Sequence, residues 1–215
     1  MKHGNRKQVL LAVLFLVVFV LWTVLVCWVD VQPIGPGGSA VGFGTLNSYV
    51  HDLTGVHMGL YVLTDWLSLI PLGIVAGFAL LGLTQWIRRK RLRRVDADIL
   101  ILGGFYVTVM ALFLLFEELE INYRPILIQG TLEASYPSST TMLVLCVMPT
   151  AMMQLRGRMG NSRGKRLLSV GMSLFTAFMV AARLISGVHW VTDIVGSVLL
   201  SAGLVLLYRS MVPDR

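Results

Sequence analysis

The sequence predicts an all-α, polytopic membrane protein with six transmembrane helices and both termini in the cytoplasm. Its 215 residues are 56% hydrophobic and only 13% charged, and this length suits a single domain. The apolar residues form long runs without charge, each close to the ~20 residues that span ~30 Å of hydrocarbon. Basic residues gather between these runs, as they do in the cytoplasmic loops of membrane proteins.

The first span is expected at residues 9–29, which hold no charged side chain. A signal peptide has a shorter apolar core, followed by small residues at a cleavage site. This run instead ends in Cys27-Trp28-Val29-Asp30, so we expect a membrane anchor that is retained.

A long stretch that does not span the membrane, residues 30–64, follows. It begins rich in Gly and Pro, and from residue 45 to residue 61 it becomes mildly amphipathic, with His51, Asp52 and His57 among apolar residues. A short helix that lies in the membrane interface is expected there.

Five further spans complete the predicted fold. Two basic stretches, residues 88–94 and 156–166, separate the second span from the third and the fourth from the fifth. Pro137, with serines and threonines directly after it, indicates a helix N-terminus with several possible caps. The five spans are expected at about residues 66–87, 99–116, 138–155, 167–182 and 190–208.

Six spans place both termini on one side of the membrane, and the basic residues test this topology. On that side lie 16 of the 18 Lys and Arg residues, so the positive-inside rule makes it cytoplasmic. This placement accounts for the net charge of +7 without a nucleic-acid partner.

Only Arg124 and Arg183 face the other side. A charge at membrane depth costs about 3 kcal/mol, so we interpret both arginines as parts of a site.

The candidate site is centred on residues 183–193, between the last two spans. If a helix starts near His189, then His189 and Asp193 lie at i and i+4 and share one helix face. The Asp193 carboxylate then accepts a hydrogen bond from one imidazole nitrogen and leaves the other free as a nucleophile. The alternative is a structural histidine near a capping aspartate, with Arg183 directed at a lipid headgroup.

Two other polar stretches, residues 123–125 and 137–140, are expected on the same side as this site. Together the three stretches supply two arginines, a helix N-terminus with free N–H groups and a His/Asp pair. This combination suits an anion that carries a transferable phosphoryl group.

In order and spacing, these motifs resemble the type 2 phosphatidic acid phosphatase superfamily of integral-membrane lipid phosphatases. The family signature combines Lys-x6-Arg-Pro, Pro-Ser-Gly-His and Ser-Arg-x5-His-x3-Asp. The third motif is matched except that Ala182 replaces its first serine. The matching residues are Arg124-Pro125, Pro137-Ser138, and Arg183, His189 and Asp193. Residues 1–215 then form one six-helix phosphatase-like domain.

The resemblance implies a role for each matching residue. His189 is the nucleophile that forms a phosphohistidine, and Asp193 orients it. Neither a metal ion nor another cofactor is implied. The residues implied to bind the phosphate oxygens, with adjacent backbone N–H groups, are Arg124, Arg183, Ser138 and Ser139.

Two positions depart from the family pattern. Glu117 stands where the family has lysine, and Thr140 stands where it has the second histidine, which protonates the leaving oxygen. Threonine is a poor general acid, and general acid catalysis contributes roughly 100- to 10,000-fold to the rate. An alkoxide leaving group should therefore depart slowly, whereas a phosphate leaving group should be less affected. Alternatively, another residue supplies the proton in place of Thr140: Glu117 or its neighbour Glu118, or one of His51 and His57. In the alternative interpretation, the acidic residues belong to a solvated loop, and the two histidines are ordinary polar residues at the membrane interface.

The sequence therefore predicts an integral-membrane lipid phosphatase or diphosphatase in a cell membrane, expected to be a bacterial plasma membrane. Its active site is expected on the extracytoplasmic side, and its substrate is a membrane lipid phosphate ester or an isoprenoid diphosphate. A catalytically impaired relative that binds lipid phosphate and a lipid phosphotransferase are the alternatives. The intact His189/Asp193 pair favours an enzyme, because a protein that only binds needs no oriented nucleophile.

Overall fold

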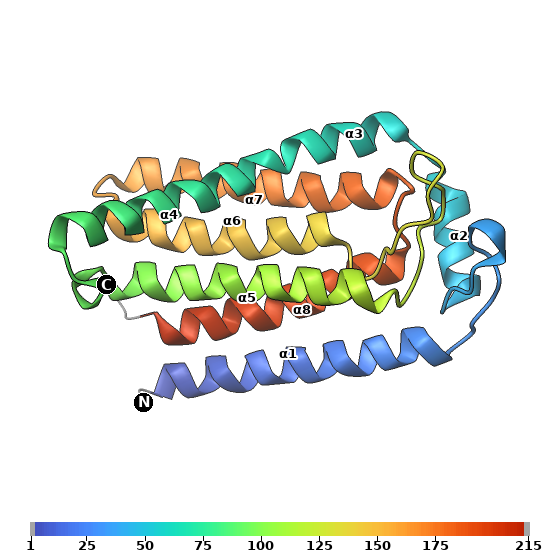
Figure 1. Cartoon of the computed structure of the whole chain (residues 1–215), viewed down its shortest axis with the longest axis horizontal. Helices are drawn as coiled ribbons and strands as arrows, with labels where there is room; N and C mark the ends of the chain where they lie inside the picture. Colours follow the sequence, from blue (N-terminus) through green and yellow to red (C-terminus); the bar gives the residue numbers. More distant parts are fainter. Residues whose placement is uncertain (1–2, 213–215) are drawn as a thin grey trace.

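The computed structural model describes residues 3–212 and is built from α-helices (Figure 1). Within this range only isolated β-bridges occur, so the predicted all-α class is confirmed. Two short 3-10 helices lie in connections, at Pro36–Gly38 and Leu92–Arg94. The α-helices are α1 (His3–Trp28), α2 (Gly44–Thr54), α3 (Met58–Leu67), α4 (Leu69–Arg89), α5 (Ala97–Leu119), α6 (Ser139–Arg158), α7 (Ser162–Ile185) and α8 (Val191–Met211).

The long helices run side by side along the long axis of the molecule, and α2 lies across one end of them (Figure 1). Helix α6 is central: it packs against α4, α5, α7 and α8, and half of its 20 residues are buried. Helix α1 packs mainly against α8. A Cβ atom added to Gly203 would lie 2.8 Å from the Leu16 side chain, so glycine there permits the close approach of these two helices.

Five helical segments are long and apolar enough to cross a membrane: α1, α3 with α4, α5, α7 and α8. Their outer faces are apolar and exposed, as at Leu10 and Leu14 of α1, which suits contact with lipid and confirms an integral membrane protein. Helix α6, the predicted fourth span, lies among them but is less apolar, because polar residues occupy both of its ends. A six-span topology therefore stays a prediction.

The two ends of the bundle differ in charge. One end holds the start of α1, the end of α8 and the α4–α5 and α6–α7 connections, which carry most of the basic residues (Figure 1). An ion pair between Arg158 and Asp98, 2.9 Å long, ties α6 to α5 there. The opposite end holds α2, the α5–α6 loop and the α7–α8 connection. The two termini therefore share one end of the bundle, and its assignment to the cytoplasm stays a prediction.

The predicted interfacial helix at residues 45–61 is corrected by the structure. Helix α2 ends at Thr54, because Gly55 adopts a φ of 66° that ends the helix. Helix α3 starts at Met58 and continues, through a short break at Ser68, into α4. The second long segment therefore begins before residue 66 and brings polar residues of α3 to the site end of the bundle.

Candidate active site

The loop between α5 and α6 folds as a narrow hairpin that presents Arg124. Gln129 and Gly130 both have positive φ, 51° and 83°, as the two central residues of a type I′ turn do. Backbone bonds hold the two arms together: the Arg124 N–H donates to the Glu133 carbonyl, and the Ser135 N–H donates to the Asn122 carbonyl. This pairing places the side chains of Arg124 and Glu133 side by side.

The connection from α7 to α8 is fixed against the α2–α3 connection. The His57 N–H donates to the Ser186 carbonyl at 3.0 Å, and Nε2 of His51 lies 3.2 Å from the Gly187 carbonyl oxygen. The His57 ring contacts the Thr54 carbonyl at 2.9 Å. The two histidines that the sequence offered as proton donors therefore contact backbone, and neither lines the pocket beside His189.

His189 and Asp193 are in contact, although not as the sequence predicted. Helix α8 begins at Val191, so His189 precedes the helix, and the expected shared helix face is wrong. Asp193, in the first turn, folds back and accepts a hydrogen bond from the Trp190 N–H at 2.9 Å. The same carboxylate oxygen lies 3.5 Å from His189 Nδ1. Capping of the helix thus holds Asp193 against the imidazole, and both side chains are almost fully buried.

Arg124 contacts the other imidazole nitrogen. Its Nη1 lies 3.3 Å from His189 Nε2, and its Nε lies 3.0 Å from a carboxylate oxygen of Glu133. Glu133 is therefore the carboxylate partner of Arg124. A phosphate bound between Arg124 and Nε2 would meet a guanidinium on one side and the nucleophile on the other.

Arg183 is buried in the last turn of α7, with only 2% of its side chain exposed. Polar residues of α3 hold it: Nη1 donates to the Thr64 hydroxyl at 3.1 Å, and Nη2 lies 3.9 Å from Asp65. The Tyr61 ring lies near both arginines, 4.8 Å from the Arg183 guanidinium carbon and 6.0 Å from that of Arg124. An aromatic face stabilises such cations, so Tyr61 helps keep two like charges close together.

The electrostatic environment favours a neutral His189. Burial and the positive charges of Arg124 and Arg183 hold the pKa of His189 well below its usual range. At neutral pH the imidazole therefore carries no charge and keeps a lone pair for nucleophilic attack. Arg183 Nε is buried and has no hydrogen-bond partner in the described structure. Buried polar groups are usually paired, so this N–H is available to donate to a polar ligand.

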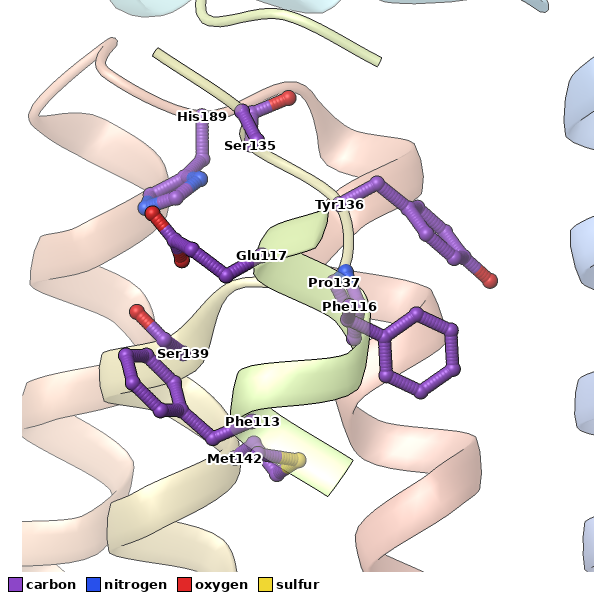
Figure 2. A pocket seen from close by; sticks show the side chains of 10 residues that line it. Phe113, Phe116, Glu117, Ser135, Tyr136, Pro137, Ser139, Met142 and His189 are labelled. Carbon is purple, nitrogen blue, oxygen red and sulfur yellow. The ribbon is translucent and has the colours of Figure 1, made fainter. Parts of the chain in front are cut away.

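A pocket beside His189 includes Glu117 (Figure 2). Glu117 belongs to the last turns of α5, and Figure 2 shows its carboxylate directed toward the His189 ring. Glu117 is therefore exposed to solvent, as that alternative expected, but it belongs to a helix instead of a loop and also lines the pocket. The pocket is lined by Phe113, Phe116, Glu117, Ala134, Ser135, Tyr136, Pro137, Ser139, Met142 and His189.

The three polar residues at the start of α6 point in different directions. Ser139 lines the pocket with His189, whereas the buried Ser138 hydroxyl donates to the Thr141 hydroxyl at 3.0 Å. The Ser138 hydroxyl is thus paired within the protein, and its contact with phosphate stays a prediction. Thr140 lines an adjacent groove instead of the pocket. Because α6 begins at Ser139, the N–H groups of its first turn have no helical partner and face this region.

Several contributors to the site escaped the sequence analysis: Tyr61, Thr64, Asp65, Asn122 and Glu133. Thr64 and Asp65 gave a signal, because they are polar residues within an otherwise apolar helix. Sequence alone carries no distance between α3 and residue 183, so the contact of Thr64 and Asp65 with Arg183 was not predictable.

Comparison with known proteins supports the resemblance carried by the motifs. A family model described as the PAP2 superfamily matches residues 107–215, just over half of the chain. The crystal structure of the first transmembrane PAP2 type phosphatidylglycerolphosphate phosphatase from Bacillus subtilis is similar, with a TM-score of 0.58 and 18% identity. The alignment covers 92% of this chain and 94% of that chain, and at this identity it establishes a shared fold. No curated protein matches the sequence.

Proposed function

The chain belongs to the PAP2 superfamily, and from this premise we propose that it is an integral-membrane lipid phosphatase or diphosphatase. One observation carries the proposal: a buried, neutral His189 contacts Asp193 through Nδ1 and Arg124 through Nε2. A nucleophile, an orienting carboxylate and a phosphate-binding cation therefore meet at one imidazole ring.

The reaction begins when the lone pair of His189 Nε2 attacks phosphorus. A P–N bond forms, the bond from phosphorus to the leaving oxygen breaks, and a phosphohistidine results. Asp193 stabilises the positive charge that develops on the ring. Arg124, Arg183 and the free N–H groups at the start of α6 stabilise the negative charge on the phosphoryl oxygens. Water then attacks phosphorus and releases inorganic phosphate.

An apolar groove beside the pocket supports a lipid substrate. It lies between α4, α5 and α6, and its lining includes Phe113, Ser139 and Met142, which also line the pocket with His189. A phosphate at His189 can therefore be joined to a hydrocarbon chain that stays in the apolar layer. Leu72, Val109, Met110 and Leu143 complete the apolar part of the groove.

The end of the bundle that holds the site suggests the side on which it works. Basic loops gather at the opposite end, which the positive-inside rule assigns to the cytoplasm. We therefore place the site on the extracytoplasmic side of a cell membrane, with a bacterial plasma membrane as the expected one.

A relative that binds lipid phosphate without hydrolysing it is the second candidate. Thr140 and Glu117 favour it, because they replace family residues that assist catalysis. A phosphotransferase would use the same phosphohistidine and pass the phosphoryl group to an acceptor other than water.

The proposed function is tested by phosphate release from a lipid monophosphate and a lipid diphosphate, with protein purified in detergent. We expect release from both, and we expect it to persist in EDTA because the proposed steps use only side chains and water. Binding of either lipid phosphate without release would overturn hydrolysis in favour of the binding candidate. Transfer of the phosphoryl group to an added acceptor alcohol, without release of inorganic phosphate, would indicate the phosphotransferase.

A further inference from the structure

The proposed reaction needs a group that delivers a proton to the leaving oxygen. Thr140, which stands where the family has histidine, lines the adjacent groove and does not line the pocket with His189. An alkoxide is a poor leaving group without a proton, and general acid catalysis typically contributes roughly 100- to 10,000-fold. A monophosphate ester therefore requires a donor that lies in the pocket itself.

The other titratable side chains near the pocket do not fit this role. His51 and His57 contact backbone carbonyls outside the pocket. The Tyr136 hydroxyl is directed away from the pocket and lies 2.7 Å from the Thr23 hydroxyl, and burial raises the pKa of Tyr136 above its ordinary value. Glu133 forms an ion pair with Arg124.

We propose that Glu117 transfers the proton in both steps of the reaction, a role that rests on the proposed function. Its carboxyl group is directed toward the His189 ring and lines the same pocket (Figure 2). Its side chain is also exposed, so it can exchange protons with water between turnovers. The polar residues that line this pocket with Glu117 are Ser139 from α6, Ser135 and Tyr136 from the α5–α6 loop, and His189 from the α7–α8 connection. Arg124 lies beside Nε2 of His189.

The proton transfers balance over one turnover. As His189 Nε2 attacks phosphorus, the protonated Glu117 gives its proton to the leaving oxygen and becomes a carboxylate. The carboxylate then accepts a proton from the water whose oxygen attacks the phosphohistidine. The P–N bond breaks, its electron pair returns to His189, and inorganic phosphate leaves. Glu117 is protonated again, ready for the next lipid.

Glu117→Gln tests this role, and Glu118→Gln is the matched control. Glu118 is the next residue on α5 and is also exposed, but it does not line the pocket. We expect Glu117→Gln to lower kcat for a lipid monophosphate by about 100-fold or more. The loss for a lipid diphosphate should be less, about tenfold, because a phosphate leaving group needs little protonation. Glu118→Gln should resemble the unmodified protein with both substrates.

The choice of substrate separates proton transfer from a structural effect. Loss of a proton donor lowers the monophosphate rate far more than the diphosphate rate, whereas a displaced pocket lowers both rates equally. An equal loss for both substrates, an unchanged rate or a faster rate in Glu117→Gln would overturn the role of Glu117 while the proposed function stands. An unmodified protein inactive with both substrates would overturn the proposed function itself and this role with it.

Discussion

Replacing His189 with alanine is expected to abolish phosphate release from every lipid phosphate that the protein hydrolyses. The imidazole is the proposed nucleophile, and removing a catalytic nucleophile commonly costs a factor on the order of 10,000 to 1,000,000 in kcat. Lipid phosphate should still bind, because Arg124 and Arg183 are held by Glu133, Tyr61 and Thr64. The measurement is phosphate release in detergent together with lipid-phosphate binding.

The control for this variant is His57→Ala. The His57 ring contacts the Thr54 carbonyl, and the His57 backbone N–H that donates to the Ser186 carbonyl survives the substitution. We expect nearly normal kcat from His57→Ala. Phosphate release by His189→Ala within about tenfold of the unmodified rate would contradict a nucleophilic role, since loss of a catalytic nucleophile costs far more than this.

Gly187→Ala is expected to cause the second largest loss of activity, although Gly187 contacts no substrate. Its φ of +68° is unfavourable for alanine, and an added Cβ would lie 2.0 Å from the Gly55 carbonyl oxygen. The connection that carries His189 must therefore move away from the α2–α3 connection. A displacement of about 1 Å at a nucleophile costs roughly 100-fold in kcat, so we expect at least this loss.

Gly130→Ala is the matched control for the loss at Gly187. Gly130 has a positive φ of +83°, but an added Cβ there would meet nothing within 4 Å. The control therefore has the backbone strain without the collision, and we expect it to keep most of its activity while it loses about 1 kcal/mol of stability. Equal activities for the two variants, at equal thermal stability, would show that the packing of Gly187 on Gly55 does not position His189.

The sequence was sufficient to predict the helical class and most of the long helices, because a long apolar run without charge spans a bilayer as an α-helix. It was less reliable where helices begin. Helix α8 starts at Val191 instead of near His189, since the Asp193 side chain caps the Trp190 N–H. Local capping geometry depends on how the chain enters the helix, which the i, i+4 spacing does not specify.

The candidate site was predictable where its residues share a motif and unpredictable where helices meet. Arg183, His189 and Asp193 are close in sequence, and the structure places them at one end of the bundle. The contact of Tyr61 with Arg183 depends on how α3 packs against α7. The pairing of Arg124 with Glu133 depends on the turn at Gln129-Gly130, which sets the register of the hairpin. Such long-range contacts require the assembled fold.

The most direct test of the account is to trap the phosphoenzyme. Protein in detergent is mixed briefly with a radiolabelled lipid phosphate and quenched in alkali, which preserves the P–N bond of a phosphohistidine, whereas acid cleaves it. We expect alkali-stable, acid-labile label on the peptide that contains His189, and none in His189→Ala. Label on a different residue, or rapid phosphate release while His189 stays unlabelled throughout the turnover, would contradict the central claim that His189 is the nucleophile.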